Sequence, residues 1–206
     1  MKVYLKNGDE LAVEEGAKCI DAAKAVSDSL ARNAVAVKLN GKLTDLSAPL
    51  SQGDKVEFVT LKDKEGLEVY RHTCAHVLAQ AVKTIFPTCK LAIGPVIENG
   101  FYYDFDFNTP ITQEDFEKIE AEMQKIIKAN TPIERFELPR AEAVKLMSDY
   151  KEKYKVELIN DLPEGETISF YKQGSFTDLC RGPHLPPTGK IKAFKLTSLA
   201  GAYWRG

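Results

Sequence analysis

Short apolar runs separated by turn signals characterise the first sixty residues of the chain. Two Asn-Gly pairs, at residues 7–8 and 40–41, each lie between apolar runs, which is the strongest short-range signal of a β-hairpin. Between the two pairs, apolar residues recur at helical spacing over residues 19–30. Strands before and after a single helix predict a small, ubiquitin-like β-grasp domain over residues 1–61, followed by a charged linker at residues 62–66.

The longer second part of the chain mixes helical and strand periodicities. Pro87 stops a first helix, and Thr112 is placed to cap a second one, whose apolar stripe consists of Phe116, Ile119, Met123, Ile126 and Ile127. The pattern predicts helices over residues 67–86, 112–129 and 140–150, a hairpin across 91–97 and 101–107, and strands over 133–138, 154–159, 168–171 and 191–196. We therefore expect a larger α+β domain with an antiparallel sheet over residues 62–206.

Composition narrows the class of protein. A length of 206 residues is enough for two small domains with their own cores, and 28% charged residues are ordinary for a globular chain. The net charge of −2 excludes a global basic field, but local basic patches could still contact a polyanion. The cysteines form no C-x2-C pair, no signal peptide precedes them, and no apolar run approaches the roughly 20 residues of a membrane helix. We expect a cytoplasmic protein without a membrane partner.

Every histidine of the chain lies in one of two phrases, His72-x3-His76 and Cys180-x3-His184. Because side chains four residues apart share a face of a helix, the first two rings should face one way and Cys74 should point away into the core. The second phrase follows a predicted strand and enters a loop. Imidazoles and a thiol in this pattern can hold zinc, position a water molecule or transfer protons near neutral pH, and the residues alone leave these alternatives open.

Other polar residues are weaker candidates. Lys155 and Arg181 are the cations expected nearest to the histidines, and Asp178 could orient a ligand amine from the strand that precedes the second phrase. Tyr103 lies in a segment where aromatic residues alternate with aspartates, and Gly94 begins a Gly-Pro turn. A metallopeptidase is disfavoured, because its motif needs a glutamate directly after the first histidine and a threonine stands there.

Four phrases give the chain a family resemblance. They read HTCAH at residues 72–76, AIGPVIENGFYYD at 92–104, DLCRGPH at 178–184 and LAGAYWRG at 199–206. Together they resemble the N-terminal part of the bacterial threonyl-tRNA synthetase family. Residues 1–61 are similar to the TGS domain of that family, and residues 62–206 are similar to its editing domain. Alanyl-tRNA synthetases carry a related editing domain, but the β-grasp start and the AYWRG ending favour the threonyl family.

The resemblance implies a proofreading function. The chain stops where the class II catalytic domain of the family begins, so we expect a piece cut from a longer protein. Such a piece lacks the sites for ATP, magnesium and catalytic zinc and cannot aminoacylate tRNA. The full enzyme is expected to be a homodimer through the absent domain, and the piece itself is expected to be monomeric. The expected partner is the 3′ end and acceptor arm of tRNA(Thr).

Proofreading also has a physical rationale. A pocket for threonine admits serine, because one methyl group discriminates by only ~1–3 kcal/mol. A second site can accept mischarged seryl-tRNA(Thr) and exclude the larger threonyl ester, and hydrolysis then needs an oriented water and stabilised charge. The resemblance implies that His72 places or deprotonates the water, and that Lys155 stabilises charge or protonates the leaving hydroxyl.

The resemblance assigns the pocket, and the binding of the amino acid or terminal adenosine, to the remaining candidates. The expected catalytic set is His72, His76, Lys155, Cys180 and His184, and the expected substrate-binding set is Gly94, Tyr103, Asp178 and Arg181. The family site is similar to a metal site but works without zinc, so we expect no bound metal. Three alternatives remain: a non-catalytic module that binds the tRNA acceptor arm, an alanyl-type editing domain, and a small domain in which zinc on the histidines only stabilises the fold.

Overall fold

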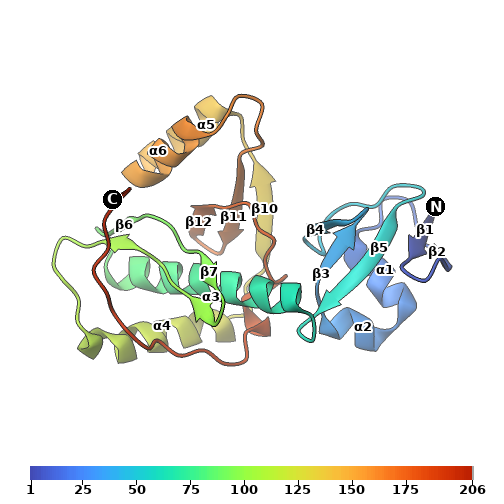
Figure 1. Cartoon of the computed structure of the whole chain (residues 1–206), viewed down its shortest axis with the longest axis horizontal. Coiled ribbons are helices and arrows are strands. Elements are labelled where there is room, and N and C mark those ends of the chain that lie inside the picture. The colour runs from blue at the N-terminus through green and yellow to red at the C-terminus, as the bar shows by residue number, and fades with distance from the viewer. Residues whose placement is uncertain (206) are drawn as a thin grey trace. The chain divides into compact units, whose positions relative to one another are not determined.

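A computed structural model describes residues 1–205 of the chain (Figure 1). These residues form two units, of which the first contains Met1–Arg71 and Gly182–Pro186. The second contains His72–Arg181 and the described residues from Pro187 onward. The units divide inside a helix, and the predicted domain boundary between residues 61 and 62 stays a prediction.

The first unit is built on a five-stranded sheet with the strand order β2-β1-β5-β3-β4. Strand β1 runs parallel to β5, and the other neighbouring strands are antiparallel. The elements are β1 (Lys2–Leu5), β2 (Glu10–Ala12), α1 (Cys19–Val26), α2 (Asp28–Asn33), β3 (Ala34–Leu39), β4 (Lys42–Thr44) and β5 (Lys55–Thr60). This arrangement confirms the predicted β-grasp fold.

Asn40 and Gly41 close the hairpin between β3 and β4, as the sequence predicts. Leu39 pairs with Lys42, so the loop has two residues, and their φ angles are 51° and 85°. A two-residue turn with positive φ at both positions matches the right-handed twist of the strands that it joins.

The core of the first unit lies between the sheet and α1. Residues at helical spacing on α1 meet inward-facing strand residues in one apolar cluster. The fully buried members include Val3, Cys19, Ala22, Val37, Leu46 and Val56.

Helix α3 (Lys64–Ile85) follows β5 and carries residues of both units. The predicted linker at residues 62–66 is therefore wrong for residues 64–66, which belong to the helix, and only residues 62 and 63 lie outside it. The chain enters the helix through a tight turn, in which the Asp63 carboxylate accepts a 2.8 Å hydrogen bond from the Thr60 N–H. Gly66 serves close packing rather than flexibility, because a Cβ atom there would lie 1.9 Å from the Thr60 carbonyl oxygen.

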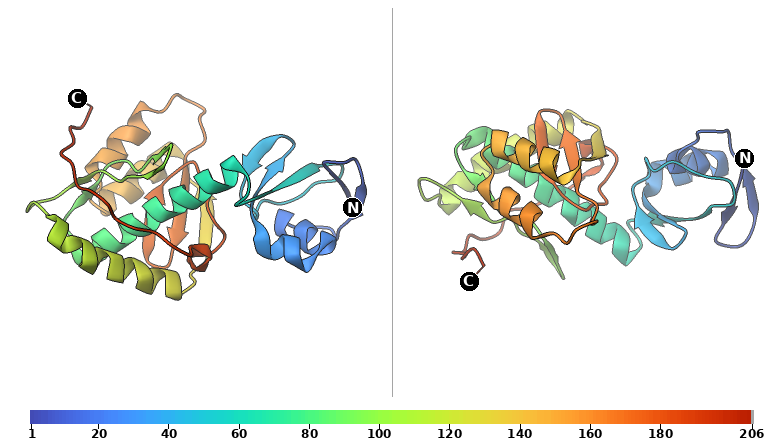
Figure 2. Two further views of the ribbon diagram at one scale, coloured as in Figure 1. Left: turned by 60° about the horizontal axis from the view of Figure 1, so that its bottom comes forward. Right: turned by 90° about the horizontal axis from the view of Figure 1, so that it is seen from above.

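The second unit contains an antiparallel sheet in the order β10 (Ile133–Glu137), β11 (Ser169–Gln173), β12 (Phe176–Leu179). Helices α5 (Arg140–Asp149) and α6 (Lys153–Asp161) lie together beside this sheet (Figures 1 and 2). Their shared core consists of Ala143, Met147, Ile159, Ile168 and Phe170. Because successive strand residues point to opposite faces, the neighbours of Phe170 on β11 face the other side of the sheet.

Helix α4 (Phe116–Lys128) lies alongside α3 in Figure 1 and in the left view of Figure 2. A single turn, η1 (Gln113–Asp115), precedes it. The predicted cap is confirmed, because Thr112 and Asp115 form a capping box. The apolar stripe of α4 buries Ile119, Met123, Ile126 and Ile127.

Short elements complete the second unit. Strand β6 (Lys90–Leu91) pairs with β9 (Phe105–Asp106), and β7 (Val96–Ile97) pairs with β8 (Gly100–Phe101), which confirms the predicted hairpin. A helical turn, η2 (Thr188–Lys190), packs against α4.

Two predicted strands are wrong. Residues 154–159 lie in α6, where Lys155 and Ile159 are buried one helical turn apart. The alternation of apolar and charged residues in so short a segment fits the period of a helix as well as that of a strand. Residues 191–196 also alternate, but among the described residues they pair with no strand, and alternation without a neighbouring strand does not make a sheet.

Helices combined with antiparallel sheets confirm the predicted α+β class. None of the helices over residues 1–205 has the length and apolar character needed to span a bilayer.

Candidate functional site

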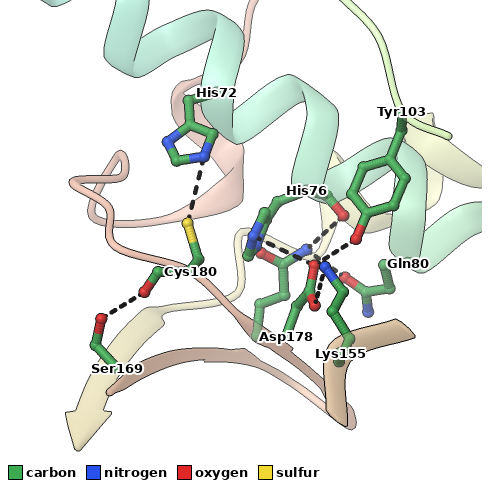
Figure 3. Close-up of polar contacts among 9 residues, drawn as sticks. His72, His76, Gln80, Tyr103, Lys155, Ser169, Asp178 and Cys180 are labelled. Atoms are coloured by element: carbon green, nitrogen blue, oxygen red, sulfur yellow. Dashed lines mark hydrogen bonds and ion pairs between the residues drawn. The ribbon is translucent and has the colours of Figure 1, made fainter. Parts of the chain in front are cut away.

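Helix α3 presents a polar side chain on each of three successive turns: His72, His76 and Gln80 (Figure 3). The three residues share one face of the helix because they are four positions apart. The centroids of the two imidazole rings are 5.8 Å apart, and the rings meet edge to face. Cys74 lies off this face and is buried, as predicted.

Asp178 of β12 is the centre of the contacts in Figure 3. The Tyr103 hydroxyl donates a 2.6 Å hydrogen bond to Oδ2, and the Lys155 ammonium lies 3.0 Å from Oδ1. His76 Nε2 is 3.6 Å from Oδ2. The side chains of Lys155 and Asp178 are 4% and 2% exposed, so water barely reaches this ion pair. Tertiary folding therefore brings together α3, the β8–β9 loop, α6 and β12 around one carboxylate.

The surroundings of Asp178 keep it charged. Burial acts to raise the pKa of the carboxyl group, but the charge of Lys155, together with the hydrogen bond from Tyr103, outweighs burial and holds the pKa below its ordinary value of 3.8. Burial and the neighbouring Asp178 charge raise the pKa of Tyr103 well above its ordinary value of 10. The tyrosine hydroxyl therefore keeps its proton and acts as a donor.

The same surroundings keep His76 neutral. Burial is the main cause, and the charges of His72 and Lys155 add to it, so that the pKa of His76 falls to about 3 although Asp178 opposes the shift. Aromatic rings on β11 and β12 approach the imidazole edge-on, with centroids at 6.4 and 6.1 Å. His76 is consequently a neutral, positioned imidazole at physiological pH.

His72 and Cys180 form a second, more open part of the site. Cys180 Sγ lies 3.3 Å from His72 Nε2, and both residues are only partly buried. The backbone of Cys180 extends the β11–β12 pairing, because its N–H donates to the Ser169 carbonyl and its carbonyl accepts from the Ser169 hydroxyl. The thiol is therefore held beside the imidazole by the end of the sheet.

Gly94 is next to the ring of Tyr103. A Cβ atom at Gly94 would lie 2.2 Å from Tyr103 Cδ2, closer than any real contact allows. Phe105 also packs on the tyrosine, with a stacked ring at 4.8 Å between centroids. Glycine at position 94 thus leaves the space in which the tyrosine reaches Asp178.

Two further predicted site residues are not among the partners of Asp178 described above. Arg181 forms an ion pair with Glu166 and leaves 77% of its side chain exposed, so it does not join the contacts around Asp178. His184 is buried in the segment Gly182–Pro186 of the first unit, where its backbone N–H donates to Asp45. The assignment of both residues to the site stays a prediction.

Sequence reasoning missed two buried polar residues that support the site. Gln173 of β11 is fully buried, and its side-chain amide donates to Gln80 at 2.8 Å, which joins the sheet to α3. Glu152 precedes α6, pairs with Lys83 at 2.8 Å and accepts a hydrogen bond from the Leu91 N–H at the same distance. Strand alternation could have placed Gln173 on the face opposite Phe170, but no local signal marks Glu152.

Comparison with known families gives two matches along the chain. Residues 1–60 match the model of the TGS domain. Residues 168–205 match the domain described as "Threonyl and Alanyl tRNA synthetase second additional domain", called tRNA_SAD below, and this stretch contains Asp178 and Cys180.

Full-length relatives extend the match to every residue of the chain. The threonine–tRNA ligases of Clostridium tetani and Acetivibrio thermocellus are each 57% identical to it over 206 residues, and that of Clostridioides difficile is 58% identical over the same span. The chain corresponds to the N-terminal part of bacterial threonine–tRNA ligases. This confirms the resemblance to the threonyl-tRNA synthetase family. The chain spans 32% of the length of these relatives, so the activity of the whole ligases is not carried over to it.

Proposed function

We propose that the second unit hydrolyses the ester bond of seryl-tRNA(Thr), as the proofreading part of a threonine–tRNA ligase. The observation that carries the proposal is the buried, charged Asp178, which holds the Lys155 ammonium and the Tyr103 hydroxyl beside two histidines. Burying a charged carboxylate is costly, and packing of the core does not require one. A carboxylate that is shielded from water and held by three partners therefore indicates a function. The tRNA_SAD match and the names of the relatives add independent support.

In the proposed reaction, His72 orients or deprotonates the attacking water. Its ring is partly exposed and lies against the Cys180 thiol. A partly exposed imidazole can reach a water molecule and act on it as a general base.

Lys155 is proposed to stabilise the charge that develops on the ester, or to protonate the leaving ribose hydroxyl. Asp178 and Tyr103 fix the direction of the ammonium, and low solvent exposure strengthens its field. Neutral His76, Cys180 and His184 are proposed to shape the pocket that admits the seryl group and excludes the threonyl methyl group.

The direct test is to incubate the 206-residue chain with seryl-tRNA(Thr) and threonyl-tRNA(Thr) and to follow release of the amino acid. We expect serine to be released and threonine to be retained. His72→Ala should reduce the rate of serine release by about 10²–10⁴-fold, as expected for loss of a general base, without changing the thermal unfolding midpoint by more than a few degrees. Seryl ester loss no faster than in buffer alone would favour a tRNA-binding module without catalysis.

An alanyl-type editing activity is the second candidate, because the tRNA_SAD model describes both threonyl and alanyl enzymes. The same assay with seryl-tRNA(Ala) distinguishes the two. We expect faster hydrolysis of the ester on tRNA(Thr), and a preference for tRNA(Ala) would reverse the assignment.

Zinc binding is the alternative chemistry for this site, since His72, Cys180 and His184 are ligand types that zinc prefers. We propose that the site works without metal, because a positioned water and a buried ammonium can supply both the nucleophile and the charge stabilisation. Elemental analysis of protein purified without chelators should find no stoichiometric zinc. One tightly bound zinc per chain in the wild type, lost in His72→Ala, would contradict this.

A further inference from the structure

We propose that Glu152 is a positioning residue for hydrolysis, which holds the first turn of α6 so that the Lys155 ammonium lies on Asp178. This inference rests on the proposed function, in which Lys155 is the cation that acts on the ester or on the leaving hydroxyl. All three residues belong to the second unit. Glu152 is a buried carboxylate that the proposed reaction does not itself use.

The side chain of Glu152 joins the start of α6 to two other elements of the second unit. Its Oε2 accepts a 2.8 Å hydrogen bond from the Leu91 N–H of β6, and its Oε1 lies 2.8 Å from the Lys83 ammonium of α3. The side chain is only 5% exposed. A water-shielded carboxylate is restricted to positions that satisfy both donors, because leaving either one unsatisfied is costly. The junction of these three elements therefore has little freedom to shift.

The backbone of Glu152 is fixed as well. Its N–H donates to the Met147 carbonyl of α5 at 2.9 Å, and its carbonyl accepts a hydrogen bond of 3.1 Å from the Val156 N–H. The second of these bonds begins α6, since Glu152 is the N-cap residue of this helix. A residue that is held through both its side chain and its backbone at the start of a helix sets the position and direction of the first turn.

Lys155 lies in that first turn, three positions after Glu152, and both residues are buried. Ile159 follows Lys155 by one further turn and is also buried, so this side of α6 faces the interior of the second unit. The Lys155 Nζ atom is 3.0 Å from Asp178 Oδ1. A shift or rotation of the first turn would change this distance directly.

A chain of contacts also links Glu152 to the tyrosine of the site. Leu91, whose N–H donates to Glu152, pairs with Phe105 of β9. The ring of Phe105 stacks on that of Tyr103, and the Tyr103 hydroxyl donates to Asp178. Glu152 therefore connects the helix that carries the ammonium to the strands that support the hydroxyl, and both groups meet on one carboxylate.

Positioning of this kind affects rates, because a displacement of about 1 Å in an active site can cost on the order of 10²-fold in rate. Glutamine at position 152 keeps an acceptor oxygen for the Leu91 N–H, whereas alanine does not. Tyr154 of the same turn donates to Asp106 of β9 at 2.6 Å. This second attachment remains when Glu152 is replaced, so we expect the turn to shift rather than to unfold.

The opposite end of α6 provides a matched control. Arg140 of α5 donates to three backbone carbonyls at the end of α6 and just beyond it, those of Ile159, Leu162 and Pro163. Arg140→Met removes these donors and keeps the apolar stem of the side chain. It therefore loosens the same helix at the end that does not carry Lys155.

The first measurement is proton exchange at the Lys155 ammonium of the 206-residue chain by NMR, with the signal assigned by its loss in Lys155→Met. Glu152→Ala should accelerate this exchange by at least about tenfold, the factor expected when a hydrogen bond to a charged group is lost, and Arg140→Met should leave it near the wild-type rate. Unchanged exchange in Glu152→Ala overturns the proposal, as does equal acceleration in Arg140→Met. Should Glu152→Ala fail to fold, Glu152→Gln decides, with a smaller acceleration expected and no acceleration overturning the proposal.

The second measurement is the rate of seryl-tRNA(Thr) hydrolysis. Glu152→Ala should lower kcat by about 10–100-fold with little change in KM, and Glu152→Gln should restore a large part of the rate. Arg140→Met should keep kcat within a few-fold of wild type. Equal losses of kcat in Glu152→Ala and Arg140→Met would reduce the effect to the stability of α6 and overturn the proposal.

The two measurements separate the two hypotheses. If wild-type protein does not hydrolyse seryl-tRNA(Thr), the proposed function fails, while selective acceleration at the Lys155 ammonium still establishes that Glu152 positions it. If the wild type is active and the exchange responds, but kcat stays at the wild-type value in Glu152→Ala, the positioning has no role in hydrolysis and the proposal is wrong.

Discussion

Replacing Lys155 by methionine is expected to lower the free energy of unfolding by about 3–5 kcal/mol, because removing one partner of a buried ion pair leaves an uncompensated charge. Asp178 would lose the ammonium at 3.0 Å while remaining 2% exposed and unable to recover its hydration. Methionine preserves most of the volume of the lysine, so the loss of stability reflects the removed charge rather than a cavity. Denaturant unfolding of the single variant against wild type measures the effect.

The double variant Lys155→Met/Asp178→Asn should recover much of the lost stability. Neither partner then carries a charge, and the Tyr103 hydroxyl can still donate to the amide oxygen of the asparagine. Lys145→Met is the matched control, because Lys145 pairs with Asp149 at 2.8 Å on an exposed helix face, where an ion pair contributes little to stability. A double variant as unstable as Lys155→Met alone would show that the two charges are not energetically coupled.

The same variants separate stability from the proposed chemistry. Restored stability in the double variant should not restore hydrolysis of seryl-tRNA(Thr), because the ammonium that is proposed to act on the ester is absent. Hydrolysis at the wild-type rate by the stable double variant would remove Lys155 from the proposed mechanism.

Local signals were sufficient to predict most of the secondary structure. The Asn40-Gly41 turn and the Thr112 cap depend on residues within a few positions of each other, and both are confirmed. Residues 154–159 show the limit of such signals, because burial of Lys155 and Ile159 on one side of α6 depends on partners that are far away in sequence. The same holds for residues 191–196, whose alternation meets no strand among the described residues.

The candidate site was predictable in its residue types but not in its electrostatics. The spacing of His72 and His76 placed both on one helix face, which the structure bears out. No sequence pattern indicated that Asp178 would be the shared partner of Tyr103 and Lys155. Tyr103 is 75 positions away from Asp178 in sequence, and Lys155 lies on a helix whereas Asp178 lies on a strand. Burial, which is the main cause of the shifted pKa values of His76 and Tyr103, is a property of the packed fold.

Acid should destabilise the protein through His76. In the unfolded chain this imidazole takes up a proton around its ordinary pKa of 6.5, whereas in the folded protein its pKa is about 3. The unfolded state therefore binds the proton first, so the stabilising contribution is complete above pH 6.5 and is lost as the pH falls toward 3. At about 1.4 kcal/mol per pH unit for one proton, the loss between pH 6.5 and 4 is about 3 kcal/mol.

Unfolding curves from pH 7 to 4 for wild type, His76→Gln and His72→Gln test this prediction. Groups other than the replaced histidine titrate in all three proteins, so the difference in slope between wild type and His76→Gln isolates His76. His72→Gln is the matched control, because it removes an imidazole of the same helix face that is partly exposed, and it should keep the acid-dependent loss due to His76. Equal slopes for wild type and His76→Gln would mean that His76 takes up its proton without unfolding, and the site would then have to carry an imidazolium next to Lys155. That arrangement would require Asp178 to neutralise two cations, and it would replace the neutral imidazole on which the proposed pocket depends.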